Sequence, residues 1–158
     1  MSNPLVSVIM PAYNAEKWIA EAIDSILNQT YDNIELIVWD DGSTDGTWGI
    51  LKEYSSSNTR IYGTPKNSGV TYALNRLIEK SKGKYIARMD ADDIAMPDRI
   101  EKQVKYLQNG LSVDVVGSGV RLFWDENTNT ERGKWWGNIH ISPVKILNTM
   151  KSARFIYL

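Results

Sequence analysis

The segment YIARMDADD, residues 85–93, joins a short apolar run to three carboxylates within four positions. The run is typical of a buried strand, and Asp90, Asp92 and Asp93 follow where that strand should end. Carboxylates at this spacing raise one another's pKa, so they favour a cationic partner. A divalent cation such as Mg²⁺ or Mn²⁺ is the simplest partner, because these hard ions prefer oxygen ligands. A solvated acidic turn that caps the next helix is the alternative interpretation.

The same order, a buried strand and then a polar cluster, occurs twice earlier in the chain. LVSVIM at 5–10 precedes Pro-Ala-Tyr-Asn, and Pro11 is expected to end the strand because proline cannot donate to a ladder. IELIVW at 34–39 precedes Asp-Asp-Gly-Ser, a cluster of turn and capping residues. Asn14 and Asp45 are the expected N-caps of the helices that follow these two clusters.

Apolar residues at helical spacing separate these strands and predict the rest of the architecture. We expect helices at 15–27, 47–54, 71–80 and 97–109, further strands at 60–62, 85–89, 113–116 and 120–124, a polar loop at 125–133, a last helix at 143–150, and a strand that starts with RFIYL at 154–158. Strands that alternate with helices of this length predict an α/β fold with a mainly parallel sheet flanked by helices.

The composition limits the class of protein. The 158 residues suffice for one globular domain, and we expect residues 1–158 to form a single unit. Eighteen basic and nineteen acidic side chains give a formal charge of −1, so no basic field indicates nucleic acid. The absence of cysteine excludes disulfides and favours a reducing compartment. No apolar run approaches the ~18 residues that span a bilayer, so we expect a cytoplasmic protein, with peripheral membrane contact left open.

In an open parallel sheet, ligands bind beyond the carboxyl ends of the strands, where the three polar clusters should meet. A nucleoside diphosphate would use all three: Asp40 could accept the N3–H of uracil or thymine, and Tyr13 could cover the ring. Few lysines other than Lys66 are near, so a cation on Asp92 could supply positive charge to the diphosphate. The sequence contains no P-loop, no dinucleotide fingerprint after the first strand and no nucleophile elbow.

Three separated motifs together resemble the family 2 glycosyltransferases, enzymes with the GT-A fold. The motifs are VSVIMPAYNAEKWIAEAIDSILNQTYDNIELIVWDDGSTDGT, NSGVTYALN and GKYIARMDADDIAMPDRIEKQV, within residues 5–117. The resemblance implies transfer of a sugar from a nucleotide-diphosphate donor of the UDP or dTDP type, with inversion and with Mg²⁺ or Mn²⁺. It also implies a saccharide or lipid-linked acceptor, in the synthesis of a cell-surface polysaccharide.

The resemblance assigns roles residue by residue. The positions that match the family's nucleotide-binding motifs are Pro11, Tyr13, Asn14, Asp40, Asn67, Gly69, Asn75, Asp90 and Ala91. Asp92 matches the acid of the family's D-x-D motif that binds the metal directly, and Asp90 matches the first acid of that motif, which usually lies against the ribose and the metal's water. Asp93 follows the motif at a position that in the family more often supports the loop than binds the metal. Asp41 is interpreted as a turn-forming residue and is not among the predicted ligands. Ala73-Leu74-Asn75 stands where the family commonly has A-R-N, so the arginine contact to the donor is not inherited.

The general base is not found among the motifs. Inverting transfer requires a carboxylate that takes the proton of the acceptor, and no acid after Asp93 has a matching context. We expect that base beyond Leu158, in an acceptor part that is missing, and therefore expect donor binding with little transfer. His140, the only histidine, could reach a metal or be structural. The alternatives are a non-catalytic binding module that uses exposed tryptophans and a nucleotidyltransferase, which would require a glycine-rich loop after the first strand.

Overall fold

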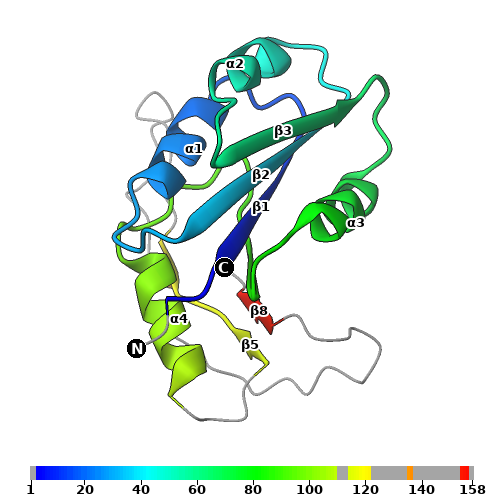
Figure 1. Cartoon of the computed structure of the whole chain (residues 1–158). Coiled ribbons are helices and arrows are strands. Elements are labelled where there is room, and N and C mark those ends of the chain that lie inside the picture. The colour runs from blue at the N-terminus through cyan, green and yellow to red at the C-terminus, as the bar shows by residue number, and fades with distance from the viewer. Residues whose placement is uncertain (1–2, 110–113, 122–134, 137–153, 157–158) are drawn as a thin grey trace.

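The computed structural model describes residues 3–109, 114–121, 135–136 and 154–156, and it contains a six-stranded sheet with the order β3-β2-β1-β4-β8-β5 (Figure 1). Every neighbouring pair in this sheet is parallel, so the predicted α/β fold is confirmed. The strands of the sheet are β1 (Val6–Ala12), β2 (Ile34–Asp41), β3 (Thr59–Thr64), β4 (Tyr85–Arg88), β5 (Val115–Val116) and β8 (Arg154–Ile156). The helices are α1 (Ile19–Leu27), α2 (Thr47–Glu53), α3 (Val70–Lys80) and α4 (Arg99–Gln108). A separate antiparallel pair consists of β6 (Val120–Arg121) and β7 (Trp135–Trp136).

Helices cover both faces of the sheet, because successive strand residues point to opposite faces. Leu36 and Val38 of β2 belong to a core formed with α1, α2 and α4. Ile37 and Trp39, the residues between and after them, belong to a second core formed with α3. Figure 1 shows α3 on one side of the sheet and α1 and α4 on the other. We call these the α3 face and the α1 face.

The strand β1 continues through Pro11, so the prediction that Pro11 ends it is wrong. The N–H of Met89 donates to the carbonyl of Ile9, and β4 pairs with β1 no further than Ile9. By the alternation along a strand, the backbone of Pro11 faces the same side as Ile9, where β4 has already ended. The N–H that proline lacks would have had no partner strand, which is why proline is tolerated there.

Two helices begin later than the sequence predicts. The helix α1 begins at Ile19, because Asn14 has a φ of 50° and its side-chain Oδ1 accepts the N–H of Thr44 instead of capping the helix. The helix α4 begins at Arg99, because the carbonyl of Pro97 accepts the N–H of Thr30 at 2.8 Å. In both places a hydrogen bond to a distant loop replaces the local helical one. The N-cap of α2 is Gly46, so the expectation that Asp45 is the cap is wrong by one residue, although the Asp45 carboxylate does accept the N–H of Thr47 at 3.0 Å.

The strand expected to start with RFIYL is confirmed as β8, which lies between β4 and β5. The expected loop at 125–133, the last helix and His140 lie outside the described residues. Within the described ranges, no helix has both the length and the apolar character that a membrane span requires.

Candidate functional site

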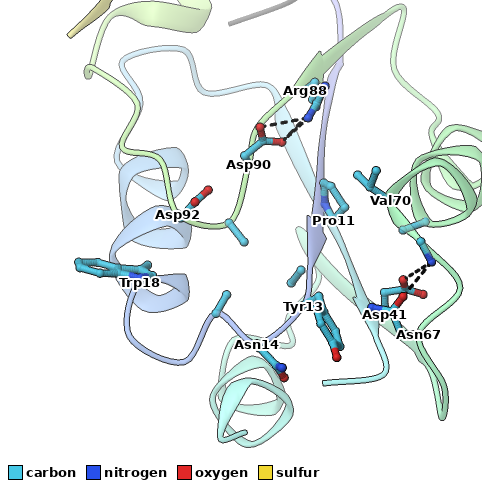
Figure 2. A pocket seen from close by; sticks show the side chains of 15 residues that line it. Pro11, Tyr13, Asn14, Trp18, Asp41, Asn67, Val70, Arg88, Asp90 and Asp92 are labelled. Carbon is cyan, nitrogen blue, oxygen red and sulfur yellow. Dashed lines mark hydrogen bonds and ion pairs between the residues drawn. The ribbon is translucent and has the colours of Figure 1, made fainter. Parts of the chain in front are cut away.

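A cleft of about 500 Å³ lies at the carboxyl ends of β1, β2 and β4, where the polar clusters meet (Figure 2). It is bounded by the end of β1 and the loop after it, by the end of β2, by the start of α3, and by the end of β4 with its acidic loop. The lining residues are Pro11, Ala12, Tyr13, Asn14, Ala15, Trp18, Asp41, Asn67, Gly69, Val70, Ala73, Arg88, Asp90, Ala91 and Asp92. The cleft therefore joins residues that are up to 81 positions apart in the sequence, from Pro11 to Asp92.

The loops after β1 and β2 are held together by reciprocal hydrogen bonds. The N–H of Asn14 donates to Ser43 Oγ at 2.9 Å, and the N–H of Thr44 donates back to Asn14 Oδ1 at 2.8 Å. One turn further on, the N–H of Gly46 donates to Glu16 Oε2 at 2.6 Å. These bonds keep the positive φ of Asn14 in place, so the neighbouring Tyr13, 49% exposed, is presented at the edge of the cleft.

The two adjacent aspartates at the end of β2 point to opposite faces of the sheet. Asp41 continues the face of Ile37 and Trp39, which is the α3 face, and it lines the cleft. Asp40 continues the face of Leu36 and Val38 and does not line it. It accepts a hydrogen bond from the hydroxyl of Ser43 and is buried. Asp40 therefore holds the loop that positions Asn14, whereas Asp41 is the carboxylate that faces the cleft.

Asp41 also anchors the loop before α3. Its carboxylate accepts the N–H of Ser68 at 3.0 Å and the N–H of Gly69 at 2.7 Å. The loop passes so close to Gly42 that a Cβ there would lie 2.6 Å from the backbone N of Asn67. Gly42 and Gly69 both have positive φ, 74° and 92°, which favours glycine at each position. The chain thus packs backbone against backbone to bring α3 to the cleft.

The acidic loop begins with an ion pair. Arg88, the last residue of β4, donates from Nε and Nη2 to Asp90 Oδ1 at 3.0 and 2.9 Å, and from Nη2 to Oδ2 at 3.1 Å. Figure 2 shows the two side chains next to each other, with Asp92 further along the same loop. Asp92 is exposed, and the Asp90 side chain is 39% exposed. The sequence interpretation did not include Arg88, although its alternation with Ile86 places it on the α3 face.

A buried arginine supports this loop from behind. Arg99, 6% exposed, donates from Nη2 to the carbonyl of Arg88 at 2.8 Å and from Nη1 to Met89 Sδ at 3.2 Å. Burial lowers the pKa of Arg99 to about 10, which leaves it charged at neutral pH. Burial, and then the charges of Asp92 and Asp90, raise the pKa of Asp93, whereas Arg99 opposes that rise. Arg99 was also missed from the sequence, because it sits within a regular helical pattern.

The carboxylates of the acidic loop suit a divalent cation that is also bound by the phosphates of a substrate. Among the described residues, no group of three or more acids and histidines gathers as a closed metal cage. Mg²⁺ does not require one, since it is usually bound by one or two carboxylates together with substrate phosphates and water. Asp92 and Asp90 can supply those carboxylates from one side of the cleft.

Eight of the residues predicted to bind the nucleotide or the metal line this cleft. They are Pro11, Tyr13, Asn14, Asn67, Gly69, Asp90, Ala91 and Asp92. Asp40 lies on the other face of the sheet, and Asn75 is exposed on α3 and does not line the cleft. Continuing the alternation of β2 by two residues would have selected Asp41 instead of Asp40. Lys66, the one lysine considered from the sequence, does not line the cleft either.

Curated relatives are similar in sequence to most of this chain. EpsE of Bacillus subtilis, named as a glycosyltransferase, is 45% identical over 125 residues, which is 77% of this chain and 45% of that protein. Chondroitin synthase of Escherichia coli is 36% identical over 134 residues, which is 84% of this chain and 20% of that protein. The chain spans about half the length of EpsE and less of the larger enzyme.

Solved structures have the same fold. TarS of S. aureus in complex with UDP has a TM-score of 0.66 and 27% identity, over 72% of this chain and 35% of that one. The mannosyltransferase PcManGT of Pyrobaculum calidifontis, in complex with GDP-Man and Mn²⁺, has a TM-score of 0.67 and 28% identity, over 77% and 37%.

The fold, the relatives and the family model lead to one assignment. The parallel sheet flanked by helices is the GT-A fold of these glycosyltransferase structures. The model of the family described as Glycosyl transferase family 2 matches residues 7–156, nearly the whole chain. The predicted resemblance is therefore confirmed, and the chain belongs to glycosyl transferase family 2.

Proposed function

We propose that this chain forms the donor-binding part of a metal-dependent, inverting glycosyltransferase whose donor is a sugar nucleotide of the UDP or dTDP type. One observation carries the proposal: a single cleft brings together an exposed aromatic ring, a buried carboxylate and an acidic loop from three strand ends. A nucleoside diphosphate has a base, a ribose and a diphosphate, and it needs all three kinds of contact at once. TarS with UDP and PcManGT with GDP-Man and Mn²⁺ support this class of ligand.

Tyr13 and Asp41 are the proposed contacts of the base. The ring of Tyr13 is half exposed at the cleft and can cover a face of the pyrimidine. Asp41 lines the cleft and is held by two backbone N–H groups, which leaves carboxylate lone pairs that can accept the N3–H of uracil or thymine. This geometry favours Asp41 over Asp40 for reading the base. Asn67 and Gly69, at the start of α3, complete that wall of the cleft.

Asp92 and Asp90 are the proposed ligands of the cation. A bound Mg²⁺ or Mn²⁺ supplies the positive charge that stabilises the departing diphosphate. Asp92 is the more exposed of the two, and none of the ion pairs among the described residues involves it, so it is the better candidate for direct contact with the cation. Arg99 holds the start of the acidic loop, at Arg88 and Met89. Both carboxylates would thereby be kept on one side of the diphosphate, with less reorganisation on binding.

The acceptor we propose is a saccharide or a lipid-linked saccharide. In the inverting reaction an acceptor hydroxyl attacks the anomeric carbon as the bond to the diphosphate breaks, and the hydroxyl proton passes to a carboxylate base. The name of the relative from E. coli, chondroitin synthase, supports a role in the synthesis of a polysaccharide. The acceptor would approach the sugar from the side of the cleft opposite the diphosphate.

Calorimetric titration with UDP, in the presence and absence of Mn²⁺, tests this function. We expect binding that depends on Mn²⁺ and is lost in Asp92→Ala. The matched control is Asp32→Ala, which removes an exposed carboxylate from the other end of the sheet. Binding that needs no metal and is unaffected by Asp92→Ala would contradict the proposal. Metal-dependent binding of UDP-sugars with no transfer to any saccharide would instead favour a non-catalytic binding module.

A further inference from the structure

Arg88 is the one basic side chain in the lining of the cleft, among the residues that the structure describes. The lining also contains three carboxylates, Asp41, Asp90 and Asp92. The cleft therefore has an excess of negative charge, although the proposed donor carries a diphosphate. A metal ion alone would have to offset the negative charges of both the carboxylates that bind it and the phosphates of the donor. A second positive group beside the metal site would reduce this repulsion.

The position of Arg88 suits that task. Its backbone is fixed, because it ends β4 and its carbonyl accepts a hydrogen bond of 2.8 Å from the buried Arg99. Its side chain lines the cleft and is 29% exposed. The guanidinium is thus attached to a fixed strand end and is accessible to a ligand in the cleft. It also lies two residues before the first carboxylate of the acidic loop, within reach of any ligand bound there.

Asp90 is a partner that Arg88 can leave. The ion pair with Asp90 has exposures of 29% and 39%, and ion pairs open to solvent to this extent contribute little to stability. The pair occupies both oxygens of Asp90, which is a proposed ligand of the cation. A cation and a guanidinium compete for these oxygens. If the guanidinium moves to the diphosphate, the diphosphate gains a positive partner and Asp90 becomes available to the cation.

We propose that Arg88 is the anchor of the donor's diphosphate and that it exchanges partners when the donor binds. Without donor, Arg88 pairs with Asp90 and neutralises it. With donor, the planar guanidinium donates to diphosphate oxygens, for which its fork of N–H groups is well matched, and Asp90 becomes available to the cation. This inference rests on the proposed function, because it requires a nucleoside diphosphate in the cleft.

The test compares Arg88→Met and Arg88→Lys with the unaltered chain. Affinities for UDP and for uridine are measured in Mn²⁺, by calorimetry and by ligand-observed NMR. We expect Arg88→Met to weaken the binding of UDP about 10-fold to 100-fold, the usual effect of a lost charge-assisted hydrogen bond. The affinity for uridine should stay within about twofold. Arg88→Lys keeps the charge but not the planar fork of N–H donors, so its affinity for UDP should lie between those of Arg88→Met and the unaltered chain. Arg76→Met is the matched control, because it breaks an exposed ion pair on α3 and Arg76 does not line the cleft.

A second readout separates partner exchange from a purely structural role. Binding of Mn²⁺ alone is followed by electron paramagnetic resonance, and thermal unfolding confirms that each variant is folded. We expect Arg88→Met to bind Mn²⁺ at least as tightly as the unaltered chain, because the mutation frees Asp90 from its partner. If Arg88→Met does not fold, Arg88→Gln replaces it, since glutamine keeps a polar side chain at this position.

The outcomes distinguish the two proposals. Equal UDP affinity in Arg88→Met and the unaltered chain would overturn the anchor and leave the proposed function intact. An equal loss for uridine and UDP, or weaker Mn²⁺ binding, would mean that Arg88 only shapes the acidic loop, which also overturns the exchange. Failure of the unaltered chain to bind UDP in Mn²⁺ would overturn the proposed function itself, and the anchor with it.

Discussion

Asp41 and Gly69 are joined by a hydrogen bond of 2.7 Å, in which the N–H of Gly69 donates to Asp41 Oδ2. The bond connects the carboxyl end of β2 to the residue before α3, so one carboxylate both closes the cleft and lines it. If Asp41 reads the base as proposed, the stability of the loop before α3 and the recognition of the base depend on the same carboxylate. Asp40, its neighbour, contributes to the same site only through Ser43 and Asn14.

Asp41→Asn should change the preference for the base. An amide can still accept one backbone N–H, but its NH₂ donates, so it no longer repels the unprotonated N3 of cytosine and no longer accepts well from the N3–H of uracil. We expect UDP to bind about tenfold more weakly or worse, and the ratio of UDP to CDP affinity to fall. Competitive titration of the two nucleotides in Mn²⁺ measures this ratio.

Asp40→Asn is the control for that prediction. Asparagine can still accept the hydroxyl of Ser43, and the residue does not line the cleft. The ratio of UDP to CDP affinity should stay within about twofold of the original, because neither base contacts this side chain directly. A changed ratio in Asp40→Asn with an unchanged one in Asp41→Asn would reverse our assignment of the two aspartates.

A pair of glycine substitutions tests the close packing beside the cleft. Gly42→Ala places a methyl group 2.6 Å from the backbone N of Asn67 at a φ of 74°, so we expect it to lower the free energy of unfolding by at least about 2 kcal/mol. Gly49→Ala, in the exposed middle of α2, meets no atom within 4 Å. It should raise the free energy of unfolding by about 0.5–1 kcal/mol, because alanine is the better helix former. Urea denaturation of both variants gives the comparison.

Glu35 should make the stability of the fold depend on pH. Burial opposes ionisation of Glu35, but hydrogen bonds from the Ser7 hydroxyl and the Lys82 N–H, together with Arg60, outweigh burial and lower its pKa. A carboxylate with a lowered pKa contributes stability above its unfolded pKa, and this contribution is lost as the pH falls through the folded value. We expect Glu35→Gln to lower the free energy of unfolding by about 1–3 kcal/mol at pH 7.

The difference between Glu35→Gln and the unaltered chain should shrink as the pH is lowered below about 4.3, the ordinary pKa of glutamate. Urea denaturation at a series of pH values from 7 to 3.5 follows it. Glu79→Gln serves as the control, because its ion pair with Arg76 is about half exposed and should contribute less than about 1 kcal/mol at any pH. A difference that is constant over this range would show that the charge of Glu35 is not what stabilises the network.

Arg99→Lys tests the support of the acidic loop. Lysine keeps the charge near Asp93 but cannot reproduce the two contacts that the guanidinium makes with Arg88 O and Met89 Sδ. We expect a loss of about 1–3 kcal/mol in the free energy of unfolding, because the half-buried carbonyl of Arg88 loses its charged donor. Metal-dependent UDP binding should weaken as the loop loses its fixed position. Unchanged stability and unchanged binding would show that the loop is held by other contacts.

The fold could be predicted from the sequence because the local patterns of apolar and polar residues agree with the tertiary structure. The apolar runs at β1, β2 and β4 are strands in the structure, and the polar clusters after them meet at one edge of the sheet. Which of Asp40 and Asp41 faces the cleft could have been predicted from the alternation of side chains along β2, because Ile37 and Trp39 already mark the face on which Asp41 lies. The motif comparison, by contrast, gives no information about which face of the sheet the cleft occupies.

Other features depend on contacts that no local pattern contains. The start of α1 is displaced by the bonds between Asn14 and the loop at 43–44, which are 29 and 30 residues away. The buried position of Arg99 becomes visible only when β4 and α4 are placed together. Each of these residues has an ordinary local context, a strand end or a helix face, and it is tertiary packing that brings it to the site.

The position of β8 has a consequence for how the protein is made. The strands β3, β2, β1 and β4 pair with one another using residues that precede Met89, so a growing chain can assemble this block early. Among the described strands, β5 pairs only with β8, whose residues are about forty positions later in the sequence. During translation β5 therefore emerges from the ribosome well before its partner. Until Arg154–Ile156 emerge, β4 presents an unpaired edge, to which the edge strand of another unfinished chain can pair.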